Sequence, residues 1–257
     1  MTRLLLACVI LLAGCGALPG AGCGPEPGST CTRVLFIGNS YTYTNDLPGM
    51  FAQLARAGGH PVETGMAAEG GAMLADAAAS PDVARTLASS RWSFVVLQEQ
   101  SQVPAAAVSR ASEMYPAAQS LATTIGATGA RTMLFMTWAH RDGWPEAGLP
   151  DYASMQVQVD DGYLAVARDL GLPVAPVGAA WAAARRSAPE LRLWQDDGSH
   201  PSAAGTYLAA CVFYAAVFRQ RPDGLSYRAG LGERDALLLQ TIATDAVLYD
   251  PERWGLR

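Results

Sequence analysis

Residues 34–42 read VLFIGNSYT, an apolar run that stops at a glycine and is followed by a serine. Its four apolar residues, 34–37, are bounded by Arg33 and Gly38, which is typical of a strand buried on both faces. Ser40 follows at once, so we expect it at the carboxyl edge of a sheet, where open α/β folds bind ligands. Gly38-Asn39-Ser40 is also ordinary turn chemistry. Two interpretations of Ser40 are therefore open here, a nucleophile and a plain turn residue.

Strands and helices alternate along the rest of the chain. Further strands are expected at 61–66, 92–97, 131–137 and 173–177, and helices at 46–57, 82–90, 105–125, 152–170, 178–186, 203–218 and 234–249. Repeated units of this length predict an α/β fold with a parallel sheet covered by helices on both faces. A body of roughly 225 residues can bury about 70% of its unfolded surface. We therefore expect one domain, residues 33–257.

Charge and composition exclude several kinds of partner and cofactor. The 257-residue chain has 18 basic and 23 acidic residues, and its basic residues are all arginine with no long cluster. Nucleic acid is therefore not an expected partner. The three histidines are scattered and no Cys or His pair has ligand spacing, which argues against a metal. Gly38-Asn39-Ser40 is not a Gly-rich phosphate turn, so no dinucleotide and no other cofactor is expected.

The amino terminus has the pattern of an export signal. Arg3 precedes an apolar run, 4–12, that is too short to span a bilayer but suits a signal-peptide core. The run ends in Leu-Ala-Gly-Cys at 12–15, which resembles the lipobox of bacterial lipoproteins. That resemblance implies a signal peptide at 1–14, lipidation of Cys15, and an exported protein anchored to a membrane of the cell envelope. Ordinary cleavage nearby, giving a secreted protein, is the alternative.

The segment after Cys15 cannot pack a core. Residues 16–30 are dense in Gly and Pro and poor in large apolar side chains, so we expect a flexible tether over residues 15–32. An oxidising compartment favours a disulfide between Cys23 and Cys31, although the sequence alone does not establish it. Cys211 lies in an apolar helical stretch and is expected to be a buried packing residue.

Small or polar residues follow each of the other long strands. Gly70 and Gly71 lie in a loop after the second strand, residues 98–101 (QEQS) end the third, and a loop with Trp138 and His140 follows the fourth. Right-handed crossovers would bring these loops to the same sheet edge as Ser40.

A carboxylate and an imidazole stand three residues apart in the loop 196–202, DDGSHPS. Asp197 can hold one nitrogen of His200 while the other nitrogen points outward, which is the orienting pair that a serine nucleophile requires. A serine hydroxyl attacks poorly at neutral pH unless a neutral histidine takes its proton. The pair therefore favours the nucleophile interpretation of Ser40.

Gly-Asn-Ser and Asp-x-x-His-Pro together resemble the motifs of the SGNH (GDSL-type) hydrolase family. The resemblance implies a flavodoxin-like three-layer α/β/α sandwich with about five parallel strands. It also implies a catalytic triad, with Ser40 as the nucleophile, His200 as the general base and Asp197 orienting the base. The family's oxyanion hole uses the nucleophile's own backbone N–H, a glycine N–H and an asparagine amide. Gly71, or alternatively Gly70, fits the second role.

The chain departs from the family pattern in two places. Asn39 stands where the family usually has an aspartate, and QEQS replaces Gly-x-Asn-Asp at 98–101. Gln100 can donate the same amide hydrogen bond from one methylene further, so it is assigned the asparagine's role, with Gln98 left open as the alternative. The departures indicate a divergent branch of the family.

The other two histidines, His60 and His140, lie outside the loop 196–202. Trp138 and His140 are expected substrate contacts, with a polar rim that has no catalytic part as the alternative. His60 falls at the opposite edge of the sheet and is expected to be structural.

The resemblance implies a serine ester hydrolase that forms an acyl-enzyme, acting on short-chain, acetyl-type esters such as those of glycans. Two alternatives use the same fold. One is a surface protein with weakened catalysis that binds a glycan or lipid, and the other is a lipase or lysophospholipase.

Overall fold

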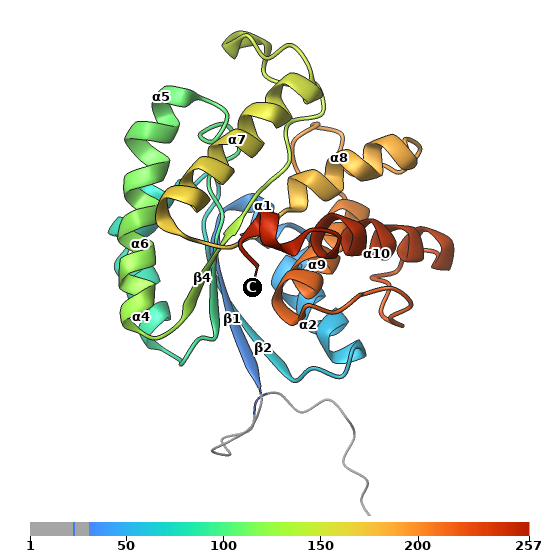
Figure 1. Ribbon diagram of the computed structural model, residues 1–257, viewed down its shortest axis with the longest axis horizontal. Coiled ribbons are helices and arrows are strands. Elements are labelled where there is room, and N and C mark those ends of the chain that lie inside the picture. Colours follow the sequence, from blue (N-terminus) through green and yellow to red (C-terminus); the bar gives the residue numbers. More distant parts are fainter. Residues whose placement is uncertain (1–22, 24–30, 257) are drawn as a thin grey trace, which may run out of the picture.

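A five-stranded, all-parallel sheet forms the centre of the computed structural model, which describes residue 23 and residues 31–256 (Figure 1). Its strands run in the order β2-β1-β3-β4-β5, which is the flavodoxin-like order. They are β1 (Thr32–Gly38), β2 (Val62–Ala68), β3 (Phe94–Leu97), β4 (Arg131–Phe135) and β5 (Val174–Ala175). The expected α/β class with about five parallel strands is confirmed.

Helices cover both faces of this sheet. Figure 1 shows α4 (Pro81–Ala88) and α6 (Tyr115–Ala127) on one face, and α2 (Leu47–Ala57), α9 (Ala203–Phe218) and α10 (Glu233–Leu248) on the other. α7 (Tyr152–Leu170) contacts α6, and α8 (Val177–Ser187) contacts α9. α9 is apolar around its whole circumference because it packs against α2, β5, α8 and α10.

The expected long helix at 105–125 is present as a continuous helical run over 107–127, but it contains a π-helical turn. The structure has a short α5 (Ala107–Ser109), then a π-helical turn (Arg110–Met114), and only then α6. Pro116, at the start of α6, has no N–H to donate to the preceding turn, so a regular α-helix cannot run through it. The expected helix is therefore confirmed as an element, but its first half is not regular α-helix.

Two short helices were not predicted. α1 (Ser40–Tyr43) begins at Ser40 itself. α3 (Leu74–Ala79) follows the loop 69–73, which contains Gly70 and Gly71 and is called the glycine loop below. Each is too short to give a periodic apolar pattern. Asn45 and Asp46 have positive φ values of 56° and 55°, and they turn the chain from α1 into α2.

The cysteines divide into a bridge and a buried thiol. Cys23 and Cys31 form a disulfide just before β1, and Cys211 is fully buried in α9. The expected signal peptide at 1–14 and the lipidation site Cys15 lie outside the described residues, as does most of the tether. Within the described residues, no helix has the length and apolar character to cross a bilayer.

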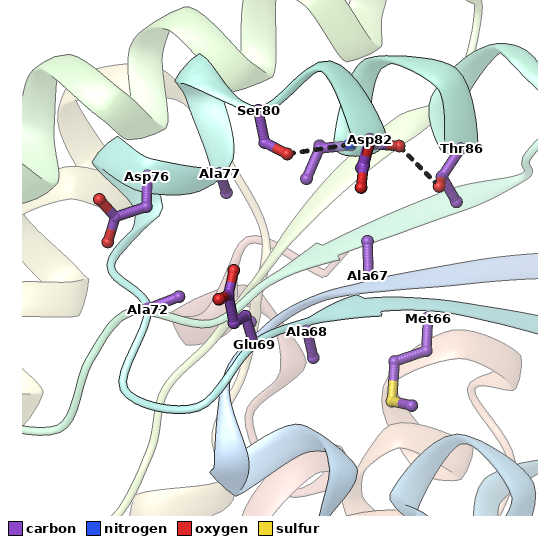
Figure 2. Close-up of a pocket in the computed structure, with 12 residues that line it drawn as sticks. Met66, Ala67, Ala68, Glu69, Ala72, Asp76, Ala77, Ser80, Asp82 and Thr86 are labelled. Carbon is purple, nitrogen blue, oxygen red and sulfur yellow. Dashed lines mark hydrogen bonds between the residues drawn. The ribbon is translucent and has the colours of Figure 1, made fainter.

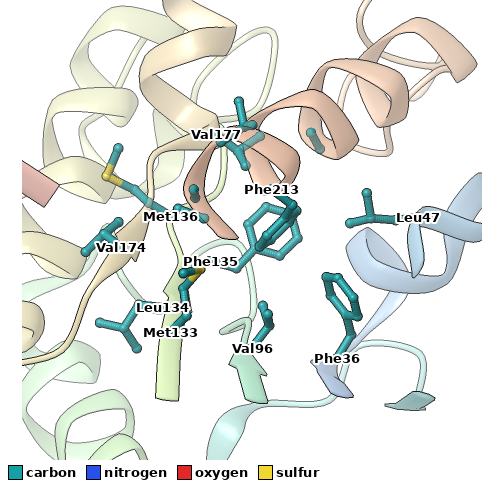
Figure 3. Packing of buried hydrophobic residues seen from close by; sticks show 14 of the residues in the cluster. Phe36, Leu47, Val96, Met133, Leu134, Phe135, Met136, Val174, Val177 and Phe213 are labelled. Carbon is teal, nitrogen blue, oxygen red and sulfur yellow. The ribbon is translucent and has the colours of Figure 1, made fainter. Parts of the chain in front are cut away.

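Phenylalanines join the sheet to the helices on the α9 face (Figure 3). The ring of Phe213 in α9 makes edge contacts with Phe36 of β1 at 5.1 Å and Phe135 of β4 at 4.9 Å between centroids. All three side chains are buried. Burial of rings in these orientations contributes packing energy beyond the area removed from water. Phe213 therefore packs α9 against both β1, which leads to Ser40, and β4.

Phe213→Ala tests this contact. We expect the free energy of unfolding to fall by about 3–5 kcal/mol, because the substitution leaves a cavity between α9 and the sheet. Urea unfolding followed by circular dichroism measures it. Val157→Ala on the exposed face of α7 is the control and should change stability by no more than about 0.5 kcal/mol. Equal effects of the two substitutions would contradict the assignment.

Candidate active site

Ser40 lies at the carboxyl end of β1, where the strand passes directly into α1. Asn39 caps this helix, because its Oδ1 accepts a hydrogen bond from the Tyr41 N–H at 3.1 Å. The Asn39 Nδ2 donates to the Ala72 carbonyl oxygen at 2.9 Å, which ties the glycine loop to the start of α1. An aspartate in its charged form has no hydrogen to donate there. The asparagine therefore has a structural task that the family's usual aspartate could not perform.

Hydrogen bonds connect Ser40, His200 and Asp197 in a row. His200 Nε2 lies 2.9 Å from Ser40 Oγ, and His200 Nδ1 lies 2.6 Å from Asp197 Oδ2. The other carboxylate oxygen, Oδ1, accepts the Ser199 and His200 N–H groups at 2.9 and 3.0 Å. Partial burial alone would raise the pKa of Asp197, but these backbone N–H groups and the His200 side chain outweigh it, so its pKa lies below 3.8. An ionised Asp197 orients the imidazole with Nε2 facing the serine.

Aromatic rings support the loop that carries His200. The ring of Trp138 stacks on Tyr41 at 4.5 Å and on Trp181 at 3.9 Å between centroids. Trp138 Nε1 donates to the Ser199 carbonyl oxygen at 3.0 Å, and the Tyr41 hydroxyl lies 2.7 Å from Ser199 Oγ. Burial raises the pKa of Tyr41 to about 12, so this hydroxyl keeps its proton. The stacked rings and their two contacts with Ser199 hold the loop that carries His200 in place next to α1.

The prediction that Trp138 contacts a substrate was wrong. Its side chain is fully buried between Tyr41 and Trp181, so a ligand cannot reach it. The sequence placed Trp138 in a strand-end loop, but it did not show that two other rings cover it.

The Gln98 side chain is buried and hydrogen-bonded inside the protein. Its Oε1 accepts the Asn39 N–H at 2.8 Å and the Thr42 hydroxyl at 2.9 Å, and its Nε2 donates to the Glu99 carbonyl oxygen at 2.6 Å. The side chain is 1% exposed. Gln98 is therefore too deeply buried to reach a ligand, and it is not among the residues that line the cavity beside Ser40, which leaves Gln100 as the candidate of the two.

Gln100 has its amide nitrogen free. Its Oε1 accepts the Gln102 N–H at 2.8 Å and the Val103 N–H at 3.3 Å, which fixes which end of the amide faces the loop. Among the described residues, Nε2 has no hydrogen-bond partner. A cavity of about 320 Å³ lies beside it, lined by Asn39, Ser40, Tyr41, Tyr43, Gly70, Gly71, Gln100, Ser101, Ser199 and His200.

Two backbone N–H groups at the same cavity are also without a partner among residues 31–256. They belong to Ser40 and Gly71. Gly71 has φ +73°, which disfavours a side chain there, whereas the space around its Cα is open. The structure thus brings Ser40, Gly71 and Gln100 to one cavity with His200, and Gly70 lines it too.

His140 lies behind the cavity wall. Its Nε2 is 3.0 Å from the hydroxyl oxygen of Ser101, which lines the cavity. Burial lowers the pKa of His140 below 6.5, so its imidazole is neutral at neutral pH. Sequence reasoning did not single out Ser101, Ser199 or Tyr41, because their roles depend on partners 39 to 158 residues away. His60 stacks on Phe218, consistent with a structural position.

A second cavity, of about 330 Å³, lies beside the glycine loop (Figure 2). Glu69 and Ala72 of this loop line it, together with residues of β2, α3 and α4. Residues of the glycine loop therefore line both cavities, Gly70 and Gly71 the first and Glu69 and Ala72 the second. Within the described ranges, no group of three His, Cys, Asp or Glu side chains is arranged to hold a metal ion.

Solved structures resemble this chain over most of its length. A candidate SGNH hydrolase from Slackia heliotrinireducens is 33% identical, with a TM-score of 0.61 over 72% of this chain and 97% of that protein. A DUF4886 family protein from Bacteroides uniformis is 21% identical, with a TM-score of 0.74 over 85% and 95% of the two chains. An acetyl xylan esterase is 14% identical, with a TM-score of 0.59 over 72% and 99%. No protein-family model and no curated protein matches the sequence.

Gln98→Leu tests the buried amide that joins β3 to α1. The substitution keeps the volume but leaves the buried Asn39 N–H without an acceptor, so we expect a loss of about 1–3 kcal/mol in the free energy of unfolding. Gln119→Leu, on the exposed face of α6, is the matched control and should stay within about 0.5 kcal/mol. Chemical denaturation measures both, and a Gln98 variant as stable as the control would refute the role.

Proposed function

Because the chain belongs to the SGNH hydrolase family, we propose that it is a serine esterase that forms an acyl-enzyme. The observation that carries the proposal is the unbroken row of hydrogen bonds from Asp197 through His200 to Ser40 Oγ, at 2.6 and 2.9 Å. These distances are within reach for proton transfer. The row ends at a cavity that a substrate can enter.

In the proposed reaction, Ser40 Oγ attacks the ester carbonyl carbon while His200 Nε2 takes the serine proton. Asp197 stabilises the imidazolium that forms. Collapse of the tetrahedral intermediate breaks the bond to the alcohol, which leaves with the proton from His200. Water, deprotonated by His200 in turn, then attacks the acyl-enzyme and releases the carboxylic acid and free Ser40.

The negative oxygen of the intermediate needs hydrogen-bond donors. We assign this role to the backbone N–H groups of Ser40 and Gly71 and to Gln100 Nε2. Support comes from their position at one cavity and from their lack of other partners in the described part of the chain. The longer glutamine can replace an asparagine because its Oε1 is fixed by two backbone N–H groups.

The cavity favours a short acyl group. The described residues that line it are polar, aromatic or glycine, and none has an aliphatic side chain to hold a long hydrocarbon chain. This argues against a lipase or lysophospholipase. Acetyl-type esters, including those of glycans, fit best, and a structural neighbour is an acetyl xylan esterase. His140 holds Ser101, which lines the cavity, and in this proposal it does not contact the substrate itself.

Ser40→Ala and His200→Ala test the reaction. Each should reduce hydrolysis of a small aryl acetate by about 10⁴-fold or more, because nucleophile and base act as one unit. Ser120→Ala, at an exposed serine of α6, is the control and should retain wild-type activity. Wild-type activity in either the Ser40 or the His200 variant would refute the assignment. If the wild-type protein bound a glycan or lipid but did not hydrolyse the ester, a binding protein with weakened catalysis would be favoured instead.

Gln100→Ala should lower kcat for the same ester by about 100-fold, because it removes one donor to the oxyanion. KM should change little, since the donor acts mainly in the transition state. Steady-state kinetics measure both constants. A variant with unchanged kcat would show that another group completes the oxyanion hole.

We also propose an envelope lipoprotein anchored through Cys15. Mass spectrometry of the mature protein, expressed with its own leader in a bacterium, should find residue 15 first and carrying acyl chains. Cys15→Ala should abolish the lipid and release the protein from the membrane fraction. An unmodified terminus in the wild type would instead support a secreted protein.

A further inference from the structure

The Glu99 side chain lies buried between the two loops that carry Gly71 and Gln100. Its Oε1 accepts the Leu74 N–H at 3.1 Å and the Gln100 N–H at 2.6 Å. Leu74 is the first residue of α3, three positions beyond Gly71. One carboxyl oxygen thus joins the loop after β2 to the loop after β3.

We infer that Glu99 is a positioning residue that holds Gly71 and Gln100 at the separation an oxyanion requires. The inference rests on the proposed esterase function. It goes beyond that function because Glu99 itself does not touch the cavity. Glu99 would act through the two donors that it holds apart.

Hydrogen bonds also fix the backbone of Glu99, so its side chain extends from a rigid position. The Glu99 N–H donates to the Tyr163 hydroxyl of α7 at 3.1 Å, and its carbonyl accepts from Gln98 Nε2 at 2.6 Å. Tyr163 and Gln98 are both buried. The glycine loop is held at a second point, where Asn39 Nδ2 binds the Ala72 carbonyl. A loop held at Ala72 and Leu74 leaves little freedom to Gly71.

A carboxyl group suits this place better than an apolar side chain. An apolar residue would leave the Leu74 and Gln100 N–H groups buried without an acceptor, which is costly. Glu99 Oε2 is buried and has no partner among the described residues, so it can carry a proton while Oε1 continues to accept. The link therefore persists in both charge states, and it is stronger when ionised.

Glu99 changes charge near neutral pH. Burial raises its pKa to about 7, although the N–H groups of Gln100 and Leu74 oppose the shift. Asp76 of α3 and Glu113 of the π-helical turn raise it further through their negative charges. The chemical shifts of the Leu74 and Gln100 amide groups should therefore both follow the titration of Glu99.

Kinetics of Glu99 variants test the role. Glu99→Ala should lower kcat for a small aryl acetate by about 10- to 100-fold with KM within about twofold, because displaced donors act in the transition state. Glu99→Gln keeps an oxygen for both N–H groups and should stay within about fivefold of wild type. A purely structural role would lower thermal stability in both variants without this separation of kcat from KM.

A matched pair at Leu74 tests the link from the other side. Leu74→Pro removes the N–H at a helix position that accepts proline, and Met73 before it is already extended, with φ −94° and ψ 163°. Leu74→Ala also shortens the side chain but keeps the N–H. We expect kcat of the proline variant to be lower than that of the alanine variant by about tenfold.

Amide NMR spectra of the full-length protein give a readout that needs no substrate. The Leu74 and Gln100 signals should shift together with one pKa across neutral pH, and these shifts should vanish in Glu99→Gln. Independent or absent titration would overturn the link. Hydrolysis that depends on Ser40, with equal kcat for Glu99→Ala and Glu99→Gln and equal kcat for Leu74→Pro and Leu74→Ala, would overturn this inference and leave the esterase proposal standing. A wild-type protein without esterase activity would overturn both proposals.

Discussion

The hydrogen bond from the Asn39 N–H to Gln98 Oε1 is the constraint on which the site depends. It joins the ends of β1 and β3, neighbours at the centre of the sheet, and it is shielded from water. Because α1 starts at the next residue, this bond fixes the direction in which Ser40 leaves the sheet. His200 comes from a loop 160 residues later, yet it finds Ser40 within 2.9 Å. That match requires a rigid strand end on one side and a supported loop on the other.

The departures from the SGNH motifs are linked in space. Asn39 donates to the Ala72 carbonyl and Gln98 accepts from Asn39, while Glu99 joins Leu74 to Gln100. Asn39 thus binds Gln98 and the glycine loop, and Glu99 binds both the start of α3 and the backbone of Gln100. The altered third block then forms a buried polar network, rather than a damaged copy of the usual motif. Apart from Glu99 Oε2, which has no partner among the described residues, the polar atoms named here are hydrogen-bonded, and such a network makes a site rigid.

Much of the fold was predictable because it follows from local patterns. Apolar runs gave the buried strands, and apolar periodicity with caps such as Asp46 gave the long helices. Strand ends pointed to Ser40 and to the loops that carry Gly71 and Gln100, because parallel strands end on one edge. His200 was found by its spacing from Asp197, and the roles of Gly71 and Gln100 came from the family resemblance. Trp138 was misjudged, since burial between two rings is a tertiary property. The Glu99 link was missed because its bond to the Leu74 N–H joins residues 25 positions apart. The π-helical turn was missed although Pro116 is a local signal of an irregular helix.

The central claim is that Ser40 is an activated nucleophile, and covalent labelling tests it most directly. A fluorophosphonate ester reacts with a serine only where a base takes the proton and donors stabilise the charged oxygen. Peptide mapping by mass spectrometry after treatment of the folded protein should find the phosphonyl group on Ser40, and none after heat unfolding. A folded protein that stays unlabelled, or is labelled at another serine, would contradict the account.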